Sequence, residues 1–340
     1  MKTKASERQK RKIKKALRVT GGLFGAVLFF AAALFLIHRW ENRPTVSAEN
    51  TEEQEQEGDL YFNGAWYSLR QDLQTAVLFG VDKYTDQQEP GVFINYQQAD
   101  YILLLVLDER DGLCRALPLN RDTMTRVSQL DLNGLPMGSR YEQLALSHTY
   151  GSGGEDSGRN VARAVSDLLY GVPVEHFIGI SMDAVSVLAD AVDGVPVTVE
   201  QDFSGITDQL PMGETVLLKG PLALQFVRAR GSVGEQTNLE RMSRQQQFMT
   251  AFYPRWREKS AAGGNDFLLD VLDKLSADMT TDCSAAFFSS LSENMESGKF
   301  VLLDPPVGEA VTGEQFMEFY VEEEALQKTV VDLFYRRCES

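Results

Sequence analysis

Eight consecutive residues in the first third of the chain constrain the fold most strongly. They run from Asp100 to Leu107 with the sequence DYILLLVL, and after Asp100 the apolar side chains are not interrupted by polar ones. A strand that is apolar on both of its faces has to be covered on both faces. The segment therefore predicts a buried strand in a sheet with layers of structure on either side.

Other apolar runs predict the neighbours of this strand. Residues 75–80 lead to Val81 and Asp82, and residues 113–119 follow a hairpin turn at 109–112. Further strands are expected at 176–181, 195–199 and 300–303, and helices at 140–147, 158–170, 183–192 (with Asp183 as its cap), 220–227, 238–259 and 322–337, with two amphipathic helices in 266–298. Helices that interleave with hydrophobic strands predict an α/β fold, with a mixed central β-sheet flanked by helices.

The N-terminus predicts a membrane anchor ahead of this fold. Residues 21–37 carry no charged or strongly polar side chain, and as a helix they would rise about 25 Å, close to the thickness of a bilayer core. Nine Lys and Arg residues precede the segment, and only Arg39 and Arg43 follow it closely, which places the N-terminus in the cytoplasm. The alternative is a cleaved signal peptide, but the candidate cleavage site at 46–48 lies far beyond the apolar segment.

These features divide the chain into five parts. Residues 41–59 are rich in Glu and Gln with almost no apolar side chain, so they form a stalk and not a core. The parts are a basic cytoplasmic tail at 1–20, a transmembrane anchor at 21–40, this acidic stalk at 41–59, a catalytic domain at 60–260, and a mostly helical extension at 261–340 that packs on or follows the core.

Charge and cysteine content exclude several classes of protein. The net charge is −16, and because the first twenty residues carry +8, the remainder sums to −24, which disfavours nucleic acid as a partner. Three cysteines are too few and too uneven for a disulfide-built fold, although Cys283 with Cys338 stays open as a pair. The three histidines, including His176, are scattered along the sequence and predict no zinc cluster.

Four arginines lie close together in the segment 226–247 of this acidic chain. Arg228 and Arg230 share a face on extended backbone, and Arg241 and Arg244 share a face on a helix together with Gln245. Facing pairs of guanidinium groups suit a doubly charged oxyanion such as phosphate or pyrophosphate. The alternative is four surface arginines paired with nearby acidic side chains.

Strand ends supply further candidates. Asp82 follows the first buried strand and Asp100 begins the second, so antiparallel pairing would bring the two together. Paired carboxylates beside arginines outline a site for Mg²⁺ and a diphosphate. Arg121 and Asp122 follow the third strand, where α/β proteins bind ligands. Ordinary strand-edge acids and a structural Arg–Asp pair remain the alternatives.

An ordered set of motifs over residues 75–250 resembles the LytR-CpsA-Psr family of cell-envelope proteins. The motifs are LFGVD at 78–82, ADYIL at 99–103, LPLNRDT at 117–123, LADAVDGVPV at 188–197, VRAR at 227–230 and RMSRQ at 241–245. The resemblance implies a phosphotransferase outside the plasma membrane, which moves a glycopolymer such as teichoic acid or capsule from a polyprenyl-pyrophosphate carrier to peptidoglycan with Mg²⁺. It implies an apolar tunnel for the prenyl chain, expected between sheet and helices.

The resemblance also assigns roles to individual residues. Asp82 and Asp100 would hold the metal, and either could accept the proton of the acceptor hydroxyl. Pyrophosphate would be bound by four arginines and supported by two further residues, namely Arg121, Arg228, Arg230 and Arg244, with Arg241 and Gln245 in support. The catalytic set is therefore Asp82, Asp100 and Arg121.

Three positions depart from the family pattern. Gln98, or the Ala99 beside it, stands where the family usually has an arginine, Asn120 replaces a proline, and Asn238 stands where many members have an aspartate. These departures leave open a non-catalytic envelope protein that binds prenyl phosphate and regulates its use. A membrane-tethered transcription regulator is disfavoured, because a cytoplasmic part of about twenty residues leaves no room for a DNA-binding fold.

Overall fold

The computed structural model describes residues 59–82, 95, 97–131, 133–229, 238–313 and 316–338, which belong to a compact unit spanning Gln56–Ser340. The predicted tail, anchor and nearly all of the stalk lie outside the described residues, as does Arg230. Within the described ranges, no helix is long and apolar enough to span a bilayer.

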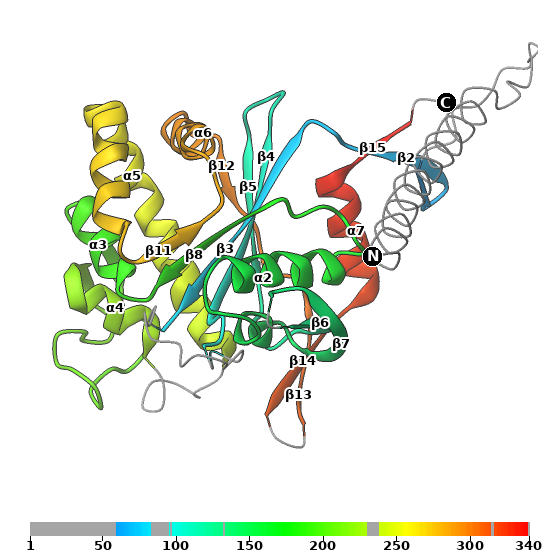
Figure 1. Cartoon of the computed structure of the whole chain (residues 1–340). Coiled ribbons are helices and arrows are strands. Elements are labelled where there is room, and N and C mark those ends of the chain that lie inside the picture. The colour runs from blue at the N-terminus through cyan, green and yellow to red at the C-terminus, as the bar shows by residue number, and fades with distance from the viewer. Residues whose placement is uncertain are drawn as a thin grey trace, which may run out of the picture. The chain divides into compact units, whose positions relative to one another are not determined.

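A six-stranded mixed sheet forms the centre of the unit (Figure 1). Its strands, in spatial order, are β11 (Met279–Thr281), β8 (His176–Ser181), β3 (Leu73–Val81), β4 (Tyr101–Asp108), β5 (Cys114–Leu119) and β12 (Phe300–Leu302). Strand β3 runs parallel to β8 and antiparallel to β4, while β12 runs parallel to β5. The predicted mixed α/β fold is confirmed, and both edge strands come from the region after residue 260.

Helices cover both faces of this sheet, as Figure 1 shows. The described helices are the 3₁₀ helix η1 (Leu144–Thr149), α2 (Glu155–Leu168), α3 (Ala184–Ala191), α4 (Gly220–Arg228), α5 (Asn238–Leu275), α6 (Ala285–Glu296) and α7 (Glu323–Phe334). Leu103 and Leu105 of β4 pack into one apolar core with α3 to α6, while Leu104 and Val106 pack into a second core with α2 and α7. The uninterrupted apolar run of β4 thus serves two cores, because successive side chains point to opposite faces.

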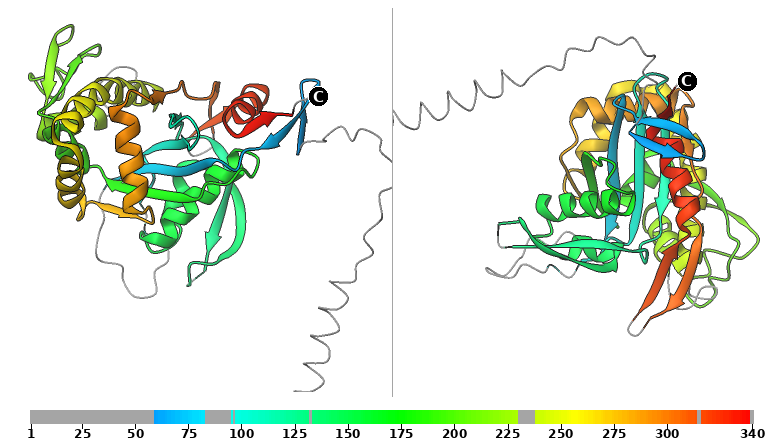
Figure 2. Two further views of the ribbon diagram at one scale, coloured as in Figure 1. Left: turned by 90° about the horizontal axis from the view of Figure 1, so that it is seen from above. Right: turned by 90° about the vertical axis from the view of Figure 1, so that its right-hand side faces the viewer.

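Smaller sheets surround this centre. They are β1 (Leu60–Phe62) with β2 (Ala65–Leu69) and β15 (Tyr335–Arg337), β6 (Met124–Leu130) with β7 (Pro136–Gln143), β9 (Val195–Thr198) with β10 (Thr215–Leu218), and β13 (Gly308–Thr312) with β14 (Met317–Val321). The β13–β14 hairpin projects away from the central sheet (Figure 2). Its base is tied to the region after β5, because Phe319 N donates to Asp122 O at 2.9 Å.

Some predicted elements need correction. The helix expected at 140–147 is wrong over its first half, because Pro136–Gln143 is the exposed strand β7 and only η1 follows it. The last helix ends at Phe334, and its expected final turn is strand β15. The break expected near residue 261 is a kink at Gly264, whose φ of 56° a glycine adopts without strain. Asp183 precedes α3 but makes no side-chain cap.

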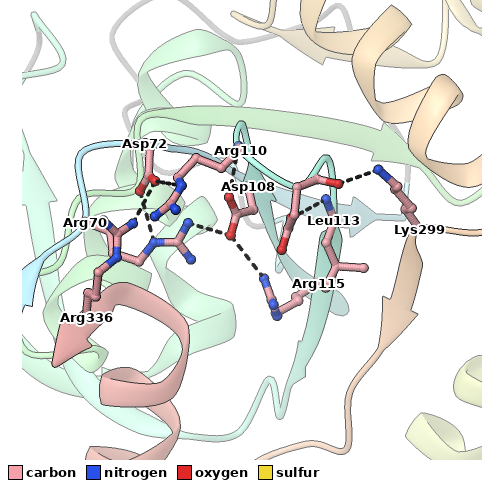
Figure 3. A network of polar contacts seen from close by, with 9 residues as sticks. Arg70, Asp72, Asp108, Arg110, Leu113, Arg115, Lys299 and Arg336 are labelled. Carbon is pink, nitrogen blue, oxygen red and sulfur yellow. Dashed lines mark hydrogen bonds and ion pairs between the residues drawn. The ribbon is translucent and has the colours of Figure 1, made fainter.

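An ion-pair network holds the end of the sheet where β4 finishes (Figure 3). Arg70 contacts Asp108 at 2.5 Å and Asp72 at 3.0 Å, and Arg336 of β15 contacts Asp72 at 2.9 Å. Burial opposes ionisation of Asp108, but the hydrogen bond and charge of Arg70 outweigh it and lower the pKa of this carboxyl. The network therefore stabilises the end of β4 that is opposite to Asp100.

Candidate functional site

The ends of strands β3, β4 and β5 that carry the candidate residues lie together at one end of the central sheet. Gly80 of β3 is opposite Tyr101 of β4, and the Asp100 backbone N–H donates to the Gly80 carbonyl at 2.7 Å. Strand β5 is antiparallel to β4, so Arg121 follows β5 at this same edge. The predicted approach of the Asp82 and Asp100 strand ends is confirmed.

Asp100 lies between two buried arginines from distant parts of the chain. Its carboxylate forms an ion pair with Arg121, and its Oδ1 lies 3.4 Å from Nη1 of Arg241. Arg241 also donates to the backbone carbonyl of Asp100 at 3.1 Å. The side chains of Asp100 and Arg121 are 11% and 10% exposed, so the pair is mostly buried but keeps some contact with solvent.

Polar side chains around Arg121 fix its orientation. Gln98 Oε1 accepts a hydrogen bond from Arg121, whose Nε lies 3.3 Å from Asp122 Oδ1. Asp122 in turn accepts from Gln143 at 3.1 Å. Two departures from the family pattern thereby have structural roles, since Gln98 is an acceptor for Arg121 and Asn120 Oδ1 accepts from the Asp122 backbone N–H at 3.0 Å.

A second ion pair lies nearer to solvent. Arg228, the last residue of α4, contacts Asp82 at 2.9 Å, with side chains that are 47% and 56% exposed. Exposed pairs of this kind are weak and exchange partners readily. Both groups are thus available to an incoming ligand in a way that the buried Asp100 cluster is not.

Arg244 is turned into the protein and supports the end of α4. Its guanidinium group donates to the backbone carbonyls of Phe226 and Ala229 and to Gln201, and it lies 5.9 Å above the ring of Phe203. Burial lowers the pKa of Arg244, although the nearby charge of Glu240 opposes this shift. The contacts hold the backbone on either side of Arg228.

An apolar cavity of about 190 Å³ lies between the sheet and the helices α3, α5 and α6. It is next to the charged cluster of Asp100, Arg121 and Arg241. Its lining includes Leu103, Leu105, Ile178, Phe248, Phe252 and Trp256. A cavity with the predicted apolar character is therefore present between sheet and helices.

Two residues join this cavity to the charged cluster. Tyr101 and Gln245 line the cavity and also a narrow cleft that Asp100 and Arg121 border. Gln245 is 5% exposed, and its Oε1 has no hydrogen-bond partner among the described residues. A buried amide oxygen without a partner is costly, so this atom marks a place for a donor from a ligand or water.

Several residues of the site were not foreseen from the sequence. Trp256 and Met249 line the cavity from α5, and so do Phe248 and Phe252. Their spacing of four residues on a helix is the signal that would have revealed them. The contact of Gln98 with Arg121 had no such signal, because it joins two loops.

The fold and its site define an α/β protein in which arginines and aspartates at the edge of a mixed sheet border an apolar cavity. The chain belongs to the LytR_cpsA_psr family, whose model matches residues 35–320. The match extends beyond the motifs at 75–250 into the strands and helices of the C-terminal region.

Curated relatives include polyisoprenyl-teichoic acid–peptidoglycan teichoic acid transferases TagU. The one from Halalkalibacterium halodurans is 24% identical over 202 residues, covering 59% of each chain. One from Bacillus cereus is 22% identical over 252 residues, covering 74% of each chain. The chain thus spans little more than half the length of the first of these relatives.

Solved structures share the fold at low sequence identity. B. subtilis TagV has a TM-score of 0.57 at 20% identity, covering 78% of this chain and 98% of its own. The protein gbs0355 from Streptococcus agalactiae has a TM-score of 0.60 at 18% identity, covering 77% and 87%. TagT bound to LI-WTA has a TM-score of 0.57 at 19% identity, covering 77% and 90%.

Proposed function

We propose that this protein is a phosphotransferase that moves a glycopolymer from a polyprenyl-pyrophosphate carrier to peptidoglycan outside the plasma membrane. The observation that carries the proposal is the position of Tyr101 and Gln245, which line both the apolar cavity and the cleft of Asp100 and Arg121. A ligand placed across these two residues would have an apolar tail and an anionic head. The names of the curated relatives favour the same chemistry.

The apolar cavity supports this proposal, because part of an isoprenoid tail would be buried among its side chains. Its volume of about 190 Å³ exceeds the roughly 150 Å³ of engineered apolar cavities that stay dry and take up small apolar ligands. Aromatic side chains such as Phe248 and Phe252 give it a large apolar wall. The tail would provide binding energy while the head is held at the sheet edge.

Balanced charge at the sheet edge gives a reason for a divalent cation. The described groups are four guanidinium groups and four carboxylates, namely Arg121, Arg228, Arg241 and Arg244 with Asp82, Asp100, Asp122 and Glu240. Even with the positive charge of Arg230 added, a pyrophosphate would leave the site with an excess of negative charge, which favours a further cation. Asp82 and Asp100 provide carboxylate oxygens, the ligands that Mg²⁺ prefers, and the cation would neutralise charge on the phosphate oxygens.

The transfer itself forms one bond and breaks one. A hydroxyl oxygen of peptidoglycan forms a bond to the phosphorus nearer the glycopolymer, and the bond from that phosphorus to the bridging oxygen breaks. Polyprenyl phosphate leaves, and the hydroxyl proton passes to an aspartate. Asp82, at 56% exposed, is the more accessible of the two to an acceptor. Arg121, Arg228 and Arg230 bind the phosphates in this scheme, and Arg241 and Gln245 support them. Arg244 was predicted to bind the phosphates too, but its guanidinium group instead holds the backbone around Arg228.

The test is transfer by the full-length chain in detergent, with Mg²⁺, lipid-linked glycopolymer and peptidoglycan. We expect glycopolymer bound covalently to peptidoglycan, and loss of this product with Arg228→Ala. Arg159→Ala is the matched control, since Arg159 is 60% exposed and pairs only with Glu155 of its own helix among the contacts described. Lipid binding that survives in Asp82→Asn while wild type shows no turnover would support the non-catalytic regulator instead. Protease accessibility in intact cells tests the external location of the body.

A further inference from the structure

Three potential metal ligands meet at the other end of β8, away from the site of Asp100. His176 begins β8, while Asp282 and Cys283 follow the edge strand β11. Their ligand atoms all lie within 4.8 Å of one another, and among the described residues they form the only such group of three or more His, Cys, Asp or Glu side chains. The scattered histidines gave no sign of this cluster in the sequence.

The three groups are held toward one another by the local fold. His176 Nδ1 faces Asp282 Oδ1 at 3.4 Å, yet it is buried and has no hydrogen-bond partner among the described residues. Asp282 is fixed by the Phe177 backbone N–H at 2.9 Å, and the Cys283 thiol faces the Phe177 carbonyl at 3.7 Å. The Phe287 ring packs edge-on against the imidazole, with centroids 6.1 Å apart.

We propose that His176, Asp282 and Cys283 bind a divalent cation of the zinc class. An imidazole nitrogen, a carboxylate and a thiolate are ligands that zinc accepts, whereas Mg²⁺ and Ca²⁺ select oxygen alone. In a tetrahedral zinc site the ligand atoms are roughly 3.5 Å apart, so small side-chain rotations suffice. One carboxylate and one thiolate balance the charge of the ion.

Three protein ligands leave a fourth position of the proposed site for water. The His176 Nδ1 atom is buried, but the His176 side chain as a whole is 39% exposed, so a water that completes the coordination would enter along the imidazole ring. Burial raises the pKa of the Cys283 thiol to about 11, so the ion would have to displace a proton that is otherwise firmly held. This sets the site apart from a reactive cysteine, which needs a lowered pKa.

Occupancy would stabilise one wall of the apolar cavity. Asp282 and Cys283 connect β11 to α6, and both elements line the cavity through Met279, Phe288 and Leu291. A cation that joins this connection to β8 would fix the position of α6 relative to the sheet. The inference concerns the fold of this wall and does not depend on the proposed transfer reaction.

Metal substitution tests the site directly. Co²⁺ added to the full-length chain should give a thiolate-to-metal charge-transfer band in wild type and in Cys338→Ala. The band should be lost in Cys283→Ala and His176→Ala. Cys338 is the matched control, because its half-buried thiol lies against Ser68 and in no ligand cluster of the described residues. A band of equal strength in Cys283→Ala, or none in wild type, overturns the proposal.

A second measurement uses only the wild-type chain, so it does not depend on whether the variants fold. Zn²⁺ should slow alkylation of Cys283 by about tenfold and leave that of Cys338 unchanged, as read by peptide mass spectrometry. Equal protection of both thiols, or of neither, would show that zinc does not bind here. Cys114 is fully buried and serves as an unreactive reference.

Discussion

Arg241 contacts Asp100 twice, through the carboxylate at 3.4 Å and through the backbone carbonyl at 3.1 Å. The first contact places a cation beside a buried acid, and the second ties the start of α5 to the start of β4. Arg228 and Asp82 form a shorter pair at 2.9 Å, but one that is half in solvent. Burial, more than distance, separates the roles of these two arginines.

Arg241→Met should therefore destabilise the fold more than Arg228→Met. Removal of Arg241 leaves a buried carboxylate with one cation fewer, which costs about 2 kcal/mol in the free energy of unfolding. Loss of the exposed Arg228 pair should cost less than about 1 kcal/mol. Urea unfolding of both variants measures this difference, and equal losses would contradict the distinction.

Gln98→Arg should tighten the binding of inorganic pyrophosphate. The new guanidinium group would stand beside Arg121 in place of a neutral acceptor, and attraction to the anion is expected to improve affinity by about tenfold, or roughly 1.4 kcal/mol. Gln98→Met is the neutral control and should show no gain. Calorimetric titration of the full-length chain with pyrophosphate measures both affinities. Unchanged or weaker affinity in Gln98→Arg would contradict a pyrophosphate site beside Arg121.

Filling the apolar cavity should weaken lipid binding alone. Leu272 lines the cavity, and Leu272→Trp should reduce affinity for a prenyl pyrophosphate by about tenfold while affinity for inorganic pyrophosphate stays the same. Leu269→Trp, on the same helix at a side chain that is 61% exposed, should change neither. Equal affinity of the two variants for prenyl pyrophosphate would show that the prenyl chain does not bind in this cavity.

Acid should destabilise the fold through His148. This side chain is 1% exposed, and burial lowers its pKa from 6.5 to about 4, although Gln97 and Asp156 partly oppose the shift. The unfolded chain therefore takes up the proton first. Stability from the neutral imidazole is complete above about pH 6.5 and is lost as the pH falls toward 4, by roughly 3 kcal/mol in all.

His148→Asn tests this dependence, because it removes the titrating group and keeps a donor near the Gln97 carbonyl, which lies 2.9 Å from Nδ1. The free energy of unfolding is measured for both proteins at about pH 7 and about pH 4.5. The difference between wild type and variant should be smaller at the lower pH. A constant difference between the two proteins would mean that His148 does not titrate as described.

Gly158→Ala should destabilise the chain although alanine favours helices. A methyl group at this position of α2 would overlap the ring of Phe177 on β8, and the overpacking should cost about 2 kcal/mol. Gly138→Ala on the exposed strand β7 has open space around it and should be nearly neutral. Thermal unfolding compares the two, and a neutral Gly158→Ala would show that α2 can move away from the sheet.

The central strands β3, β4, β5 and β8 were predictable because apolar residues dominate each of them. Strand β7 was not, since its PMGSRYEQ sequence is almost wholly exposed and is held by pairing with β6. The three-residue edge strand β11 carries too short a pattern to be recognised alone, whereas β12 confirms the strand predicted at 300–303. Tertiary pairing decides such segments, and propensity does not.

The site was predictable where residues follow strands or share a helix face. Asp100, Arg121 and Arg241 meet as the strand ends and helical spacing indicated. The inward turn of Arg244 toward backbone carbonyls could not be read from its sequence, because an identical spacing also suits an outward-facing pair. Contacts between loops, such as Gln98 with Arg121, depend on the finished fold.

The two outermost strands of the central sheet have a consequence for the order of folding. Strands β3, β4, β5 and β8 are complete by residue 181, but β11 and β12 arrive only with residues 279–302. Until then, both margins of the sheet carry unsatisfied backbone groups that can template pairing between chains. A nascent molecule that stalls before residue 279 is thus the aggregation-prone species, and a chaperone that shields β5 and β8 would act in that interval.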